Sequence, residues 1–331
     1  MAAQDPERRA TFDAALRQAQ ELAEAAAVAG YAAKPLPLFY SLSQAGRAIA
    51  ASRLARTWQL KGHGLSPRDQ AEGILTSKVE QTGGENASFP AVAAALGSPP
   101  LAGPCELGAL WAANPDLASV PIGDRPAALR VELGVRSLGR PYDDAPPQDP
   151  ETTPTTTGGM VSLSVPLAGE TVAEVSTALE AYPTLRGAVP YGSVPGGSGP
   201  VDDASQPVVR LNDPGGRSLV NVGVTADDTM MLADYWRRQD EMCSFVETSD
   251  LIQHHATGHV LPEVAGGPAP LPLLLWWGLL LGLSSFARYE PAAWTAAIDP
   301  SSSRVAVSLE RALDVAESDI PNRILSALRD A

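Results

Sequence analysis

The sequence predicts an α+β fold, with a mainly helical body built from both chain ends around a small central antiparallel sheet. Near both ends, apolar residues recur three and four positions apart, which is the period of a helix. In the middle, short runs alternate apolar with polar residues, which is the period of a half-buried strand. This segregation of helices from strands is typical of α+β proteins. We expect an N-terminal helical region (1–100), a β-rich insertion with loops rich in proline and glycine (101–225), and a C-terminal helical region that packs with the N-terminal helices (226–331).

The N-terminal region is predicted to be helical over residues 5–97. The first helix has an apolar face and ends at Gly30; the face consists of Phe12, Leu16, Ala19 and Ala23. A Pro-Leu-Pro run opens a second helix over about residues 38–60, because proline is tolerated in the first turn. Gly62 and Gly64 end that helix around His63, and Ser66 and Pro67 fit the start of a third helix.

The central region contains four candidate strands, at residues 129–136, 160–165, 208–211 and 218–224. Between them, the stretches 141–159 and 187–206 are rich in Pro, Gly, Thr and Asp, which is typical of long loops or hairpin tips. Helices are expected again over 229–248 and 302–329, and Pro321 is expected to split the last segment into two helices.

An apolar run near residues 271–286 raises the question of a membrane span. No charged residue lies between Glu263 and Arg288. Because of the prolines before residue 273, the clean helix is only about 22 Å long, whereas a span must cross about 30 Å of hydrocarbon. We therefore expect a buried core helix rather than a membrane span.

Composition excludes several classes of protein. The chain has 24 Lys+Arg against 38 Asp+Glu and a net charge of -14, so it does not coat nucleic acid with its whole surface. Two cysteines are too few for a disulfide-rich scaffold or a zinc site of four thiolates. The charged first residues are followed by no apolar run typical of a signal peptide, so we expect a cytoplasmic protein. We also expect no membrane association and no cofactor.

Two stretches resemble the signatures of a known bacterial family. Residues 39–49 (FYSLSQAGRAI) with 62–65 (GHGL) resemble the first signature of the YaaC-like family. Residues 279–294, which include Arg288-Tyr289-Glu290-Pro291, resemble the second, and Ile320-Pro321-Asn322 also fits. The central residues 140–205 match nothing in it. The resemblance implies a soluble bacterial protein without an assigned biochemical activity.

The helical ends are also similar to HEPN domains, which often form dimeric ribonucleases or binding modules in phage-defence systems. Arg56 and His63, with six residues between them, fit the loose Arg-x(4–6)-His pattern of those ribonucleases. His63 would act as general acid or base, and Arg56 would stabilise the charge on phosphorus. The pattern here closes an early helix, whereas in HEPN ribonucleases it lies near a late one, and a helix-capping role for His63 is the alternative.

Three further groups are candidate binding residues. Arg47 and Arg53 lie in the basic stretch 34–78 and could accept a phosphate, or simply form a solvated face. Arg288 and Tyr289 follow the apolar helix and either line a ligand pocket or are structural, with Arg288 paired to a carboxylate. The histidines at 254, 255 and 259 either bind a metal ion or are exposed residues of a loop, and no metal site is expected.

These observations lead to a hypothesis with two alternatives. We expect a cytoplasmic YaaC-like protein that acts as a non-catalytic binding or regulatory component. A bacterial conflict or phage-defence system is one setting in which such a component would act. A metal-independent HEPN-like ribonuclease is the first alternative, and a structural subunit of an oligomer, supported by Trp276 and Trp277 if these are exposed, is the second. Expected partners are a protein or a second copy of the chain, with RNA or a nucleotide as a further possibility.

Overall fold

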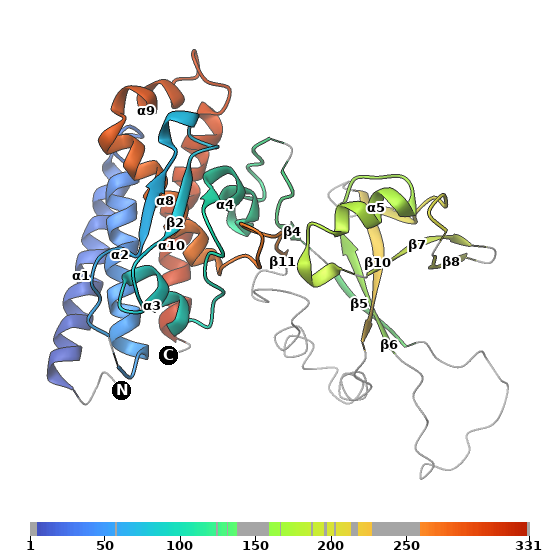
Figure 1. Cartoon of the computed structure of the whole chain (residues 1–331), viewed down its shortest axis with the longest axis horizontal. Coiled ribbons are helices and arrows are strands. Elements are labelled where there is room, and N and C mark those ends of the chain that lie inside the picture. Colours follow the sequence, from blue (N-terminus) through green and yellow to red (C-terminus); the bar gives the residue numbers. More distant parts are fainter. Residues whose placement is uncertain are drawn as a thin grey trace, which may run out of the picture. The chain divides into compact units, whose positions relative to one another are not determined.

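The chain forms two compact units, which consist of residues 1–128 with 261–331 and of residues 129–260. A computed structural model (Figure 1) describes residues 5–56, 58–123, 125–130, 132–137, 159–165, 167–186, 188–194, 197–201, 203–212, 218–226 and 259–329. The first unit thus joins both ends of the chain, and the second is formed by its middle. The boundaries lie at Ala128 and Leu261, each further towards the C-terminus than the predicted boundary.

The first unit is mainly helical and contains one small sheet. Its helices are α1 (Pro6–Val28), α2 (Pro35–Arg53), α3 (Ser88–Ala95), α4 (Leu107–Ala113), α8 (Pro272–Tyr289), α9 (Pro291–Ala297) and α10 (Ala306–Arg329), with short 3-10 turns at Gln70–Glu72 and Pro115–Leu117. Its antiparallel sheet has the order β1-β2-β3, formed by β1 (Leu65–Arg68), β2 (Lys78–Gln81) and β3 (Cys105–Glu106). The predicted α+β class is confirmed.

Helix α8 forms the centre of this unit, as the apolar run predicted. Every residue from Pro272 to Phe286 is buried, and Trp276 and Trp277 are fully enclosed. The prediction of a core helix is confirmed, and no helix in the described part of the chain is long and apolar enough to cross a membrane. The two tryptophans are therefore not available as an interface, so the oligomer alternative loses the support expected from them.

Glycines allow α2 and α4 to approach α8 closely. A Cβ atom at Gly46 would overlap the indole of Trp277, and one at Gly282 would lie 2.5 Å from Leu107. Because protein interiors are close-packed, a larger side chain at either position would force the helices apart. The glycine in the FYSLSQAGRAI stretch is thus a packing requirement.

The prediction of one helix over residues 38–60 is wrong, because α2 ends at Arg53. The side chain of Arg8 donates hydrogen bonds to the carbonyl oxygens of Ala51 (2.7 Å) and Leu54 (2.6 Å). The last carbonyls of a helix need such partners, and a distant arginine supplies them here. A contact between residues so far apart in the sequence leaves no local signal.

Two other helix predictions are also wrong. Ser66 and Pro67 do not start a helix but lie in β1, which pairs with β2 in the register Pro67 to Val79. Pro321 does not split the last segment, because α10 continues through it as one helix. Ile320 and Ile324 are buried on either side of the proline, so packing holds the helix together despite one lost backbone hydrogen bond.

The second unit is built around an antiparallel sheet with the strand order β5-β6-β10-β7-β8 and with β9 paired to β10. Its strands are β4 (Leu129–Arg130), β5 (Glu132–Ser137), β6 (Gly159–Val165), β7 (Val189–Val194), β8 (Gly197–Pro200), β9 (Arg210–Asn212), β10 (Ser218–Ala226) and β11 (His259–Val260), with helix α5 (Val172–Leu179) and a 3-10 turn at Pro183–Leu185. The predicted strands at 129–136, 160–165 and 218–224 are confirmed. The predicted loop at 141–159, except Gly159 at the start of β6, and the predicted helix at 229–248 lie outside the described residues. The other predicted loop, 187–206, contains the paired strands β7 and β8.

Candidate functional site

Residues from three separate segments meet at the surface of the first unit. Tyr40 and Arg47 lie seven residues apart on α2, which places them on one helix face. His63 lies in the loop between α2 and β1, and Arg288 lies in the last turn of α8. We call these four residues the His63 cluster.

The loop that carries His63 is held in a fixed conformation. Gly62 and Gly64 both have positive φ angles, of 70° and 76°, which favour glycine over residues with a Cβ atom. The start of α3 holds the loop, because the backbone N–H of Phe89 donates to the carbonyl of His63 (3.0 Å) and Ser88 Oγ donates to that of Gly62 (2.6 Å). The Gly-His-Gly sequence therefore presents the imidazole from a defined position.

Aromatic rings support the charged groups of the His63 cluster. The His63 ring lies 5.3 Å from the ring of Phe39 and 6.4 Å from that of Tyr40, measured between centroids. Arg288 Nη1 donates to the hydroxyl of Tyr40 (2.8 Å), and its guanidinium lies 4.8 Å from the centre of the Tyr289 ring. Among the described residues, Arg288 thus has a hydroxyl and an aromatic face as partners, and not a carboxylate. Tyr289 is 63% exposed, and its ring makes a cation–π contact with Arg288.

The surroundings of His63 favour the neutral form of its imidazole. Partial desolvation against the rings lowers its pKa, and the positive charges of Arg288 and Arg47 lower it further. An anion placed among these groups would have the opposite effect and raise the pKa. His63 makes no hydrogen bond through its ring nitrogens to any described residue, so both nitrogens are open to a ligand.

The other predicted phosphate ligand, Arg53, is not part of the His63 cluster. Its guanidinium donates to the carbonyl of Ala327 near the end of α10 (2.7 and 3.0 Å) and to that of Ala95 at the end of α3 (3.4 Å). These bonds satisfy carbonyls at two helix ends, which is a structural role. Arg47 donates to the carbonyl of Leu60 (3.3 Å) through one nitrogen only, so most of its donors remain unused.

Arg56 and His63, the predicted catalytic pair, are not brought together by any contact in the described part of the chain. Arg56 is exposed after the end of α2, and the charges that act on the pKa of His63 are those of Arg288 and Arg47. The arginines beside His63 in space are thus different from the one that the sequence spacing suggested.

The histidine group considered for metal binding is only partly described. His259 lies half-buried in β11, and residues 254 and 255 lie outside the described residues. Within the described ranges, no group of three His, Cys, Asp or Glu side chains is placed to hold a metal ion.

Tyr40 is the member of the His63 cluster that sequence reasoning missed as a site residue. It belongs to the FYSLSQAGRAI stretch, and its spacing of seven from Arg47 puts both on one face of the predicted helix. That spacing was the available signal.

A comparison with protein families matches the chain to the YaaC-like protein family over residues 2–122 and 228–328. The chain belongs to the YaaC-like family. The matched ranges include all four residues of the His63 cluster, whereas residues 123–227, which form most of the second unit, lie outside them. Searches among curated proteins and solved structures found no match for this YaaC-like chain.

Proposed function

We propose that this YaaC-like protein is a non-catalytic binding or regulatory component that takes a phosphate-bearing ligand, such as a nucleotide or RNA, at the His63 cluster. The observation that carries the proposal is the meeting of Arg47, His63 and Arg288 at one place without a carboxylate partner for either arginine among the described residues. In a chain with a net charge of -14, arginines left without acidic partners favour an anionic ligand.

The chemistry of the His63 cluster suits a phosphate group. A guanidinium offers paired N–H donors that match two phosphate oxygens, and Arg288 has donors beyond the one used on Tyr40. The hydroxyl of Tyr40 accepts from Arg288, so its own hydrogen is free to be donated to a ligand. His63 adds another hydrogen-bond donor. A bound anion favours protonation of the imidazole, which then also contributes a positive charge.

Native mass spectrometry of the protein purified from its host tests this proposal. We expect a retained nucleotide or RNA fragment in the wild type and its loss from Arg288→Gln. The control variant Arg311→Gln, which changes an exposed arginine on α10, should retain it. A wild-type protein that carries no phosphate compound and binds no added pyrophosphate would contradict the proposal.

A metal-independent ribonuclease is the second candidate, and the lowered pKa of His63 favours it. A neutral imidazole can accept the proton of a ribose 2′-hydroxyl, and a neighbouring arginine can stabilise the negative charge that develops on phosphorus. Cleavage of RNA by the wild type and its loss in His63→Ala, with unchanged melting temperature, would support this candidate. Binding of RNA without any cleavage would exclude it.

Location and partners are part of the same proposal. We propose a cytoplasmic protein that acts with a protein partner or a second copy of itself, in a conflict or phage-defence system. We also propose that the helical ends of the chain are HEPN-like. Co-purification of the tagged chain from host cells, before and after phage infection, tests for such a partner.

A further inference from the structure

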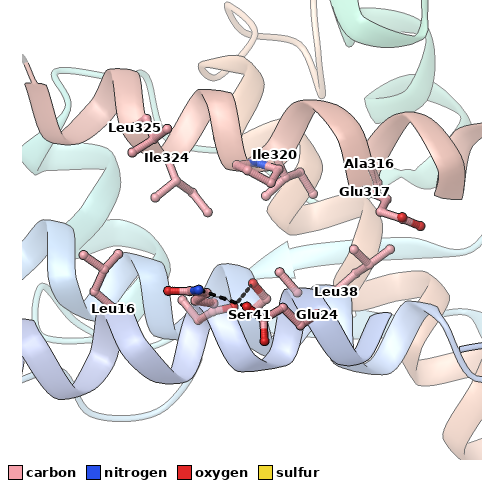
Figure 2. A pocket seen from close by; sticks show the side chains of 13 residues that line it. Leu16, Glu24, Leu38, Ser41, Ala316, Glu317, Ile320, Ile324 and Leu325 are labelled. Atoms are coloured by element: carbon pink, nitrogen blue, oxygen red, sulfur yellow. Dashed lines mark hydrogen bonds between the residues drawn. The ribbon is translucent and has the colours of Figure 1, made fainter. Parts of the chain in front are cut away.

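A second surface of the first unit has an apolar groove that no residue of the His63 cluster lines. The groove has a volume of about 390 Å³ and lies between α1 and α10, with α2 as its floor. Figure 2 shows Ile320, Ile324 and Leu325 on α10 facing Leu16 and Leu38 across it. Leu325 is 49% exposed at its edge, so an apolar contact surface remains open to solvent.

The floor and walls of the groove are almost wholly apolar. The one hydroxyl of the floor, Ser41 Oγ, is already satisfied because it donates to the carbonyl of Ala19 (2.7 Å). Small residues at Ala19, Ala23 and Ala316 leave room between the larger side chains. An occupant must therefore bring apolar side chains rather than hydrogen-bonding groups.

The rim of the groove is acidic. Glu24 and Glu317 line it, and no lysine or arginine does. Glu317 and Asp314 share one cation, Lys34, at 2.7 and 3.6 Å, whereas Glu24 receives only a neutral hydrogen bond from Gln20 (2.9 Å). This excess of carboxylates attracts a cationic occupant and disfavours an anionic lipid or nucleic acid. A second copy of the chain would bring the same net charge of -14.

The dimensions of the groove fit one face of a helix. Leu16 and Ala23 are two turns apart on α1, a distance of about 10 Å, and Ala316 and Leu325 are about 14 Å apart on α10. Such a length admits apolar side chains from two to three turns of a docked helix, which is a common mode of peptide recognition.

We propose that this groove binds an amphipathic helix of a partner protein, with apolar residues three and four positions apart and with lysines or arginines flanking them. The apolar side chains fill the space between Leu16, Ile324 and Leu325. The flanking cations pair with Glu24 and with the partly neutralised Glu317. This site is independent of the proposed anion site, so each can fail without the other.

The probe is a labelled peptide of about 15 residues, a length that covers the groove with one extra turn at each end, with leucines three and four positions apart and lysines elsewhere. Fluorescence anisotropy measures its binding to the full-length protein. We expect Leu325→Lys to weaken binding about tenfold or more, since it places a cation and removes an apolar contact at the rim. Glu24→Lys should weaken it by a similar factor at low salt and by less at high salt.

Matched controls separate the groove from general charge attraction. Val307→Lys changes an exposed apolar residue on the same helix α10 but outside the groove, and Glu21→Lys changes an exposed carboxylate on α1 outside it. Both should leave peptide binding within about twofold. A peptide of the same composition with its leucines spread around the helix should bind about tenfold more weakly.

Several results would overturn the proposal. These are no binding of the peptide, equal effects of Leu325→Lys and Val307→Lys, or equal binding of the two peptides. A wild-type dimer in sedimentation that becomes a monomer in Leu325→Lys would identify a second copy as the occupant, and would also overturn it.

Discussion

The arginine of α1 that binds the C-terminal end of α2 and the arginines of the His63 cluster are used in opposite ways. At the end of α2, Arg8 is buried and its guanidinium donates to the carbonyls of Ala51 and Leu54. In the His63 cluster, Arg288 is exposed, and its hydrogen bond goes to the hydroxyl of Tyr40. An arginine whose donors meet backbone carbonyls stabilises the fold, whereas one whose donors remain open is available to a ligand.

The largest effect is expected from Arg8→Ala. This change removes hydrogen bonds from a buried charged donor, and we expect the free energy of unfolding to fall by about 2 kcal/mol. The neighbouring Arg9 is exposed, so Arg9→Ala should change it by less than about 0.5 kcal/mol. Urea unfolding measures both. Equal losses in the two variants would remove the contrast between buried and open arginines.

The next largest effect is expected from Arg288→Gln, and it should appear in binding rather than in stability. We expect binding of pyrophosphate, measured by calorimetry, to weaken about tenfold, because one guanidinium is lost from the site. The free energy of unfolding should change by less than about 1 kcal/mol, since the side chain is exposed. A large loss of stability with unchanged binding would place Arg288 among the structural arginines.

A smaller effect is expected from pH. Partial desolvation and then Arg288 and Arg47 hold the pKa of His63 below its ordinary value of 6.5, which we take for the unfolded chain. As the pH falls through 6.5, the unfolded chain gains the proton first. The contribution of His63 to stability is therefore fully present above pH 6.5 and is lost as the pH falls towards the folded-state pKa. Urea unfolding across this range should show a shallower pH dependence in His63→Gln, and identical profiles would contradict the assignment.

The smallest effect is expected from Arg56→Ala. Arg56 is exposed and contacts none of the His63 cluster in the described part of the chain, so neither pyrophosphate binding nor stability should change measurably. A loss of binding or of RNA cleavage in this variant that exceeds the loss in Arg288→Gln would favour the sequence-based pairing of Arg56 with His63.

The sequence predicts those parts of the fold that depend on local patterns. The buried helix α8 follows from an uncharged run too short to span a membrane, and strands β5, β6 and β10 follow from alternation. Helix α5 also carries a local signal, because Thr171 and Glu174 form a capping box at its start. That signal was present in the sequence but was not used.

The sequence does not predict features that depend on distant contacts. The end of α2 depends on Arg8, and the continuity of α10 through Pro321 depends on the burial of Ile320 and Ile324. The candidate site has the same property. His63 was found from the sequence, but its neighbour Arg288 lies 225 positions further along and reaches it only through the packing of α8 against α2.

The most direct test of the central claim, that the His63 cluster is an anion site, is an NMR titration of the His63 imidazole with pyrophosphate in wild type and Arg288→Gln. The signal can be assigned by comparison with His63→Gln, since the chain has 4 histidines. We predict that pyrophosphate shifts the His63 signal and raises its pKa, and that both effects are greatly reduced in Arg288→Gln. A His63 signal that does not respond to pyrophosphate, or that responds equally in both proteins, would contradict the claim.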